Sequence, residues 1–360
     1  MIGDESSRVP DGVRRARGAG LNMAGRFERF ERVAVDDGWT PEEKDQRELQ
    51  TSVAIERARS ILSHNDSPDV GFDRSINPYR GCEHGCIYCY ARPTHEYFGL
   101  SAGLDFETKI FVKLDAPQLL RKEISQPKWR PTTIAISGVT DCYQPVERRL
   151  ELTRACLRVL LEMGNPCSVI TKNHLITRDA DVLGELARRN LVIAILSVTT
   201  LDPELSGRME PRTSSPARRL DAIRQLARAG VPAGVMVAPL IPGLTDHELP
   251  SILSACADAG AQFCGYVPLR LPFAVAPLFE QWLARHYPDR KDKVLNRIRS
   301  MRLGKLNDPN FHSRMRGHGA FADQFKKIFD LAKRRAGLDK PSPDLTTEHF
   351  RRPHGQLTMF

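Results

Sequence analysis

The chain has 360 residues, of which 41% are hydrophobic, and its formal net charge is +9 at pH 7. This length suits one large α/β domain with appendages, and the composition excludes a fibrous protein. The longest apolar runs are strand-length, far below the roughly 20 residues of a membrane-spanning helix, so we expect no membrane segment.

Residues 1–40 mix arginines with acidic residues and glycines, and they lack the apolar stretch of a secretory signal. We predict a disordered leader here and a cytoplasmic protein. Because thiols stay reduced in that compartment, the eight cysteines are expected to bind metal, act in catalysis or lie buried, rather than to form disulfides.

Residues 41–71 are predicted to form an N-terminal helical extension. Pro41 stands near its start with acidic residues in the first turn, and Ile55, Ala58, Ile61 and Leu62 recur at helical spacing.

Residues 72–272 alternate between β-prone and amphipathic segments. The β-prone segments lie around residues 74–77, 132–137, 167–171, 192–199, 231–238 and 263–269, and helical stretches include 148–163, 179–190 and 216–230. Strands that are apolar on both faces and joined by helices indicate a parallel sheet. We therefore predict an α/β fold, a partial or full (β/α) barrel, with functional residues where strands end and helices begin.

Beyond Pro272 the alternation stops, and we predict a basic helical region over 273–340 followed by a flexible tail over 341–360. Its helices are expected around 277–286, 291–301 and 323–336. From Arg285 to Phe360 there are 18 Lys and Arg against 8 Asp and Glu, a net charge of +10. This balance indicates either a polyanionic partner such as nucleic acid or a solvated, charged helical face.

The strongest pattern is Cys82-Glu-His-Gly-Cys86-Ile-Tyr-Cys89, directly after the first predicted strand. Three thiolates within eight residues, flanked by glycines that permit a tight backbone, can converge on one metal centre. Three ligands on a four-iron cluster leave one iron open to a small molecule, whereas an electron-transfer cluster normally has four. The alternative is a Zn²⁺ site completed by His84 or His95.

The C-x3-C-x2-C motif, with Tyr88 before its last cysteine, resembles the signature of the radical S-adenosylmethionine (SAM) superfamily. Five stretches resemble, more specifically, the spore photoproduct lyase-like branch of this superfamily: SINPYRGCEHGCIYCYARPTHEY, TDCYQPVE (140–147), VITKN (169–173), EPRTSSP (210–216) and RMRGHG (314–319). The resemblance implies that Cys82, Cys86 and Cys89 hold a [4Fe-4S] cluster. It also implies reductive cleavage of SAM to a 5′-deoxyadenosyl radical, with an electron from an external reductant such as flavodoxin or ferredoxin.

One fold and cofactor serve many reactions, so three functions stay open. The leading hypothesis is a lyase-type enzyme acting on a damaged or modified pyrimidine in nucleic acid. The second keeps the radical chemistry but takes a protein or a small molecule as substrate. The third is a non-catalytic, zinc-stabilised nucleic-acid-binding protein.

The resemblance also implies roles for residues at strand ends. Ser137, Gly138 and Asp141 follow the second strand, where superfamily members hold the SAM amino group. Lys172 would neutralise the SAM carboxylate, unless it is a surface cation. Ser197 would bond the ribose, unless it is a satisfied core hydroxyl.

Four further residues receive candidate roles. Tyr88 would line the adenine site, and Arg212 is a second candidate for the carboxylate or the substrate. Cys142 would donate a hydrogen atom to a product radical or else be a buried structural cysteine, and Tyr143 could relay a radical. The other cysteines are predicted to be core residues: Cys156, Cys167, Cys256 and Cys264.

The C-terminal residues Gln356 to Phe360 read QLTMF. They resemble the short peptide by which bacterial DNA polymerases and repair proteins dock on the sliding clamp, which makes that clamp a candidate partner. The alternative is an apolar tail that folds back on the barrel.

Overall fold

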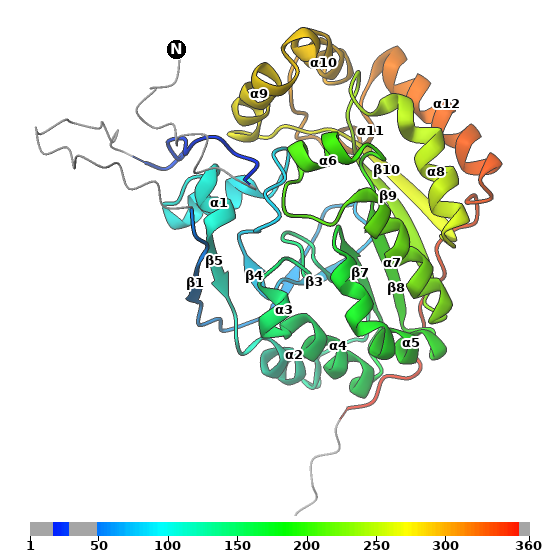
Figure 1. The fold of residues 1–360 in the computed structure, drawn as a ribbon. Coiled ribbons are helices and arrows are strands. Elements are labelled where there is room, and N and C mark those ends of the chain that lie inside the picture. The colour runs from blue at the N-terminus through cyan, green and yellow to red at the C-terminus, as the bar shows by residue number, and fades with distance from the viewer. Residues whose placement is uncertain (1–16, 29–48, 353–360) are drawn as a thin grey trace, which may run out of the picture.

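The computed structural model describes residues 17–28 and 49–352. Its main sheet has seven strands in the order β10-β9-β8-β7-β6-β3-β2 (Figure 1). Six are parallel: β3 (Arg74–Ile76), β6 (Ile134–Ile136), β7 (Cys167–Thr171), β8 (Val192–Ser197), β9 (Ala233–Leu240) and β10 (Phe263–Pro268). These are the six predicted β-prone segments. The edge strand β2 (Leu62–His64) runs antiparallel to β3.

Amphipathic helices cover the outer face of this sheet and bury their apolar residues against it (Figure 1). They are α2 (Ala116–Ile124), α4 (Leu152–Met163), α5 (Ala180–Arg188), α7 (Pro216–Arg228) and α8 (Leu249–Asp258). The predicted helix over 148–163 is interrupted. Glu151 has a φ of 51°, which separates α3 (Glu147–Leu150) from α4. The parallel sheet and its helices form the expected α/β partial barrel.

Shorter elements fill the crossovers at the carboxyl ends of the strands. They comprise α1 (Leu104–Thr108), α6 (Pro203–Met209) and the 3₁₀ turns η3 (Arg92–Phe98), η4 (His174–Asp179) and η5 (Asp246–Glu248). Asp202 caps α6, because its side chain accepts the amides of Glu204 and Leu205.

The predicted helical extension over 41–71 is wrong for its described part. Residues Ser52–Ile55 form β1, which pairs in parallel with β5 (Lys109–Val112), and β5 pairs with β4 (Tyr79–Arg80) in a small second sheet. The apolar spacing was not a buried helical face, since Ile55 is 67% exposed and Ile61 only 2%. Ladder pairing with a distant strand decided the conformation. Residues 41–48 lie outside the described residues.

The C-terminal helices lie where the sequence predicts them: α9 (Val275–His286), α10 (Pro288–Met301) and α12 (Gly319–Arg335), with a short α11 (Ser313–Arg316) between the last two. None of the described helices is long and apolar enough to cross a membrane.

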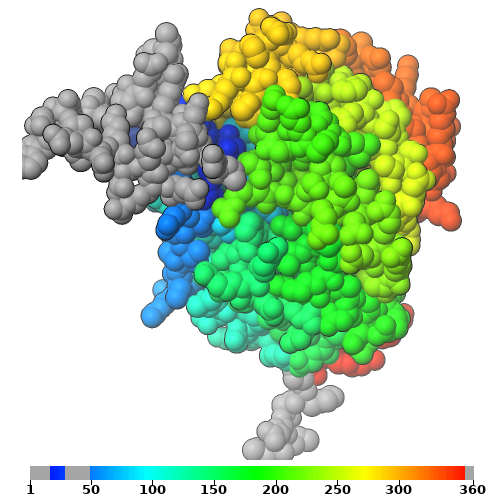
Figure 2. Space-filling view, in the orientation of Figure 1, coloured from blue at the N-terminus to red at the C-terminus, as the bar shows by residue number. Residues whose placement is uncertain are grey.

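The chain then returns along the amino ends of the strands, at the lower edge in Figure 2. The amide of Arg351 donates to the carbonyl of Met163 (2.8 Å) and that of Thr346 to the carbonyl of Asn190 (3.1 Å). Gly164, with φ of +65°, permits this approach, because a Cβ there would lie 2.0 Å from the His349 carbonyl oxygen. The predicted clamp peptide, residues 356–360, lies outside the described residues.

Candidate active site

The three motif cysteines lie on a tight loop that follows β4. Its turns need two left-handed glycines, Gly81 (φ +74°) and Gly85 (φ +66°). A Cβ at Gly85 would lie 2.8 Å from a carboxylate oxygen of Glu107, so the loop also needs glycine for close packing. The amide of Cys89 donates to the carbonyl of Cys86 (3.2 Å), which closes the turn between these two cysteines.

Two of the three cysteines are buried, and Cys89 is partly exposed. Cys82 and Cys86 are each 7% exposed, and burial raises the pKa of all three thiols. The pKa of Cys82 is raised further by Asp141 and by the other two thiols. Because a coordinated thiol is deprotonated by its metal, positive charge at this site would reverse the effect of burial.

Of the two histidines proposed as zinc ligands, His84 has partners for both ring nitrogens and His95 for Nε2 alone, since His95 Nδ1 is buried without a partner among the described residues. His84 places Nδ1 3.3 Å from Asp141 Oδ2 and Nε2 3.0 Å from the Asn173 amide nitrogen, while His95 Nε2 lies 2.9 Å from the Lys109 carbonyl. No group of three or more His, Cys, Asp or Glu in the described part of the chain is arranged to hold one metal ion. Three cysteines on one short loop suit a multi-iron cluster, whose cysteines bind different irons, better than a zinc site, which needs four ligands.

A buried ion pair holds the cysteine loop from behind. Arg92, fully buried, donates to the carbonyls of Cys86 (2.9 Å) and Gly85 (3.1 Å) and to Glu107 Oε1 (2.5 Å). Such a pair is stable only when its hydrogen bonds are satisfied, and here the guanidinium also donates to the carbonyls of Ala102 and Gly103. The pair fixes the backbone that carries Cys86.

Glu107 also anchors the N-terminal segment 17–28. Its carboxylate accepts the amides of Gly18 (3.0 Å) and Ala19 (2.8 Å), and its carbonyl accepts a hydrogen bond from Arg17 (2.9 Å). Gly18 packs directly on the loop, since a Cβ there would lie 1.8 Å from the Gly85 carbonyl oxygen. Segment 17–28 thus packs on the cysteine loop, so the predicted disordered leader over 1–40 is wrong for these residues; residues 1–16 and 29–40 lie outside the described residues.

Lys172, directly after β7, lies over the cysteine loop. Its ammonium donates to the carbonyl of Ala238 (3.0 Å), lies 3.4 Å from Glu210 and sits 5.7 Å from the centre of the Tyr88 ring. Burial lowers the pKa of Lys172 to about 8, although Cys86 and Asp141 act in the opposite direction. The structure thus brings Lys172 and Tyr88 together with the cysteines, as the assigned roles require.

Glu210 is a buried carboxylate of this site to which the sequence analysis gave no role. It accepts hydrogen bonds from Thr199 (2.6 Å) and from the buried Arg219. Thr199 in turn lies 3.4 Å from the hydroxyl of Tyr88. Burial raises the pKa of Glu210, and Arg219 opposes that shift. Glu210 lies in EPRTSSP, one of the stretches that resemble the spore photoproduct lyase-like branch. Its partner Arg219, nine residues later, could not be inferred from the spacing of that stretch.

The loop after β6 is held in place by its neighbours. Asp141 accepts hydrogen bonds from the Thr171 hydroxyl (2.7 Å) and the Lys172 amide (2.8 Å). Burial alone would raise its pKa, but His84 and these donors outweigh burial, and the net shift is downward. The Ser137 hydroxyl donates to the Thr140 carbonyl, and the Gly138 carbonyl accepts the Tyr90 hydroxyl (2.7 Å). Asp141 thus connects β6, β7 and the cysteine loop.

Cys142 and Tyr143 point into buried structure. The Cys142 thiol lies 4.0 Å from the Ile170 carbonyl within the main core, and burial raises its pKa. The Tyr143 hydroxyl donates to Asp179 (3.0 Å), which also pairs with Arg154. These contacts fit structural roles, and the proposed hydrogen-atom donor and radical relay stay predictions.

Ser197 and Arg212 occupy different positions around the site. Ser197 ends β8, and its carbonyl accepts a hydrogen bond from Arg219 (3.0 Å), while its hydroxyl has no partner among the described residues. Arg212 pairs with Glu83 (3.1 Å) and contacts Thr51 (3.3 Å). Its guanidinium therefore braces the cysteine loop, and its role toward a carboxylate or substrate stays a prediction.

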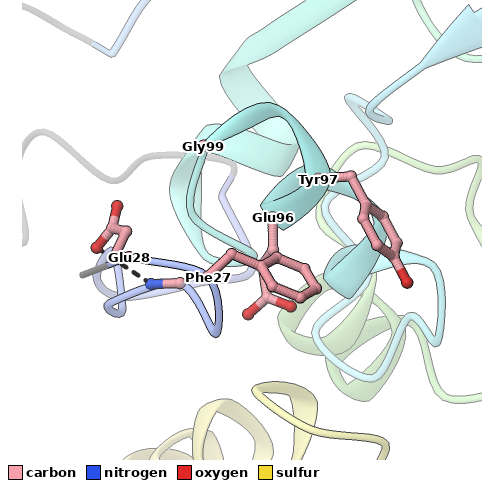
Figure 3. A pocket seen from close by; sticks show the side chains of 6 residues that line it. Phe27, Glu28, Glu96, Tyr97 and Gly99 are labelled. Atoms are coloured by element: carbon pink, nitrogen blue, oxygen red, sulfur yellow. Dashed lines mark hydrogen bonds between the residues drawn. The ribbon is translucent and has the colours of Figure 1, made fainter.

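A separate hollow lies beside segment 17–28 and contains none of the predicted site residues. Figure 3 shows Phe27, Glu96 and Tyr97 around this hollow, and the Phe27 and Tyr97 rings stack with centroids 5.2 Å apart. Arg26 pairs with Glu96 (2.5 Å) and lies 3.8 Å from the centre of the Phe273 ring. These contacts bind segment 17–28 to η3 and to the residues after β10.

The family model that matches the chain is that of the radical SAM superfamily, over residues 76–256, about half of the chain. This protein therefore belongs to the radical SAM superfamily, whose enzymes use a [4Fe-4S] cluster and SAM. Cys82, Cys86 and Cys89 fall within the matched range. This assignment replaces the alternative of a non-catalytic zinc-stabilised protein.

Similar proteins occur in bacteria and archaea. An uncharacterized protein of Mycobacterium tuberculosis is 37% identical over 248 residues, 68% of this chain and 72% of that protein. One of Methanocaldococcus jannaschii is 29% identical over 200 residues, 56% of this chain and 73% of that protein. A structure of spore photoproduct lyase complexed with dinucleoside spore photoproduct has a TM-score of 0.57 at 17% identity, covering 80% of each chain. It shares the fold.

Proposed function

We propose that this radical SAM enzyme acts on nucleic acid, at a damaged or modified pyrimidine, in a lyase-type reaction. The observation that carries the proposal is an aromatic ring and a cation beside the cysteine loop. Tyr90, directly after Cys89, is 50% exposed, and the guanidinium of Arg270 lies 5.5 Å from the centre of its ring. Arg270 makes no ion pair with a described residue, and an exposed ring beside a free cation suits an unstacked base and its phosphate.

Other observations support the same substrate class. The basic excess of the chain lies in its C-terminal part, and the fold is shared with an enzyme solved with a dinucleoside photoproduct. A sliding clamp is a proposed partner through residues 356–360, and flavodoxin or ferredoxin is a proposed electron donor.

In this proposal the chain holds and orients its cofactors. The cluster and SAM, when bound, supply one-electron chemistry at an unactivated C–H bond. Cys82, Cys86 and Cys89 would ligate the iron. Lys172 would bind the SAM carboxylate and Ser197 the ribose, while burial of the loop excludes water.

The test is anaerobic reduction with SAM in the presence of ultraviolet-irradiated DNA, undamaged DNA or no DNA. We expect irradiated DNA to increase the yield of 5′-deoxyadenosine and to lose its pyrimidine lesions. If 5′-deoxyadenosine forms at one rate in all three samples and the lesions persist, the substrate is a protein or a small molecule instead.

A further inference from the structure

A hollow of about 460 Å³ lies between α10 and α12, outside the site described above. These helices border each other at the upper right of Figure 2, in gold and orange. Its floor is the loop after β9, which contains Asp246 and His247. The volume lies within the range of about 300–1,000 Å³ that is usual for ligand sites. We call this hollow the α10–α12 groove.

One wall of the groove is cationic. Arg290, Lys293 and Arg297 line it at intervals of three and four residues, so they share one face of α10. Arg297 pairs with Asp246 (3.2 Å), which neutralises the acidic residue of the floor. Arg290 and Lys293 are exposed and form no ion pair with a described residue. Two unneutralised cations therefore face the groove.

The opposite wall is apolar apart from Gln324 and carries an exposed aromatic ring. Phe321, Phe325 and Ile328 lie on one face of α12, and Phe321 is 37% exposed. The Arg297 guanidinium lies 5.5 Å from the centre of the Phe321 ring and thereby holds it at the groove. Cations opposite a ring match the chemistry by which single strands are bound, with phosphates on the cations and bases on the aromatic face.

The groove is connected to the active site through β9. The carbonyl of Ala238 in this strand accepts the Lys172 ammonium, and the groove floor begins at Gly243, shortly after the strand ends. Gly243 (φ +80°) lets the floor approach α10, because a Cβ there would lie 3.3 Å from Arg297. Groove and active site thus open from the same carboxyl edge of the sheet.

We propose that the α10–α12 groove binds a single-stranded stretch of nucleic acid that flanks the reacting base. Its phosphates contact Arg290 and Lys293, and one base stacks on Phe321. This inference rests on the proposed function and adds to it a second contact region, away from the cysteines.

The test measures the affinity of the full-length protein for a fluorescent single-stranded DNA as a function of salt. The double variant Arg290→Ala/Lys293→Ala should bind about 10- to 30-fold more weakly near 0.1 M salt. The negative slope of log K against log salt should become shallower by about 1.4, since each lost phosphate contact on a single strand removes about 0.7 from its magnitude. Phe321→Ala should weaken binding roughly 5- to 100-fold and leave the slope unchanged, because it removes stacking alone.

The matched control is Lys327→Ala/Arg335→Ala, which removes the same charge from exposed positions of α12 that do not line the groove. It should bind nearly as the parent does, and all variants should unfold at the parental temperature and retain the parental iron content.

Two results would contradict the proposal that the α10–α12 groove binds nucleic acid. The Arg290/Lys293 variant could bind no more weakly than the control, or an acidic peptide of equal charge could displace the DNA as well as unlabelled DNA does. In both cases parental DNA binding would leave the proposed function standing. If the parent protein binds no oligonucleotide at low salt, both the groove proposal and the proposed function are refuted.

Discussion

Cys82, Cys86 and Cys89 sit where a free thiolate is unfavourable, because burial raises the pKa of each thiol. A metal centre supplies the positive charge that this environment lacks, so ligation and deprotonation are coupled. Lys172 contributes in the same direction, since it opposes the rise in the pKa of Cys86.

Replacing one ligand should therefore remove the cluster. We expect Cys86→Ala, after anaerobic reconstitution, to lose the iron absorbance, the EPR signal of the reduced cluster and SAM cleavage. The control Cys264→Ala changes a partly buried thiol of β10 and should keep all three. A Cys86→Ala protein that made 5′-deoxyadenosine at the parental rate would show that the ligands are assigned incorrectly.

Lys172 should affect SAM binding without affecting the cluster. Loss of one hydrogen bond to a charged group corresponds to about 1.5–3 kcal/mol, so Lys172→Met should weaken SAM binding roughly 10- to 100-fold. Equilibrium dialysis measures the affinity and iron analysis the cluster. Lys128→Met, at an exposed position, is the control. Parental affinity in Lys172→Met would exclude a role in binding the carboxylate.

The placement of the three motif cysteines on one loop was predictable from the sequence because all three lie within eight residues. The position of Lys172 at a strand end was predictable because it follows a recognisable strand. Glu107 was not, since its partners Arg92 and Gly18 lie 15 and 89 residues away. Contacts between residues this far apart in the sequence produce no periodic pattern that could predict them.

At the level of elements, the parallel strands were predictable from local sequence, whereas β1 depends on a partner distant in the sequence. Each parallel strand is an apolar run followed by an amphipathic helix, and such a local pattern is readable. Strand β1 is exposed over its whole length and exists because β5 pairs with it. Its sequence lacks the alternation of a half-buried strand, and helical spacing was the stronger local signal.

Segment 17–28 and the cysteine loop depend on one carboxylate, and Glu107→Gln tests that dependence. The substitution removes the charge that balances the buried Arg92, and breaking such a pair destabilises by about 3–5 kcal/mol. We expect a lower free energy of unfolding in urea and less iron retained per chain. Glu185→Gln, exposed on α5, should match the parent. Equal stability and iron content in both variants would show that Glu107 does not hold the loop.

At the scale of the whole molecule, residues far apart in the sequence join the C-terminal region to the barrel. Asp69, before the first parallel strand, accepts two hydrogen bonds from Arg314 (2.6 and 2.8 Å) and one from the His312 amide (2.9 Å). The hydrogen bond from Arg314 is the main reason that the pKa of Asp69 lies below its usual value. The stretch RMRGHG, which resembles the spore photoproduct lyase-like branch, thus contributes Arg314 to a contact between the C-terminal region and the barrel. We call the contact of Asp69 with Arg314 and His312 the clasp.

The clasp should be sensitive to acid. A carboxylate with a lowered pKa in the folded state stabilises fully above its unfolded pKa of about 3.9, and this contribution is lost as the pH falls through the folded value. Asp69→Asn should therefore be about 1–3 kcal/mol less stable at pH 7. The difference from the parent should shrink below pH 4.

Urea denaturation at pH 7, 5 and 3 measures this difference, with Asp66→Asn, at an exposed position, as the control. A deficit of constant size from pH 7 to pH 3 would mean that Asp69 contributes through packing rather than charge.

The return of residues 339–352 along the amino ends of the strands has a practical consequence. Arg352, the last described residue, donates to the carbonyls of Trp129 and Pro127, on the opposite side of the sheet from the cysteines. A label, an affinity handle or a tethering protein joined directly at Arg352 would therefore be attached on the far side of the molecule. It would leave the approach of a bulky polymer to the reaction centre unobstructed.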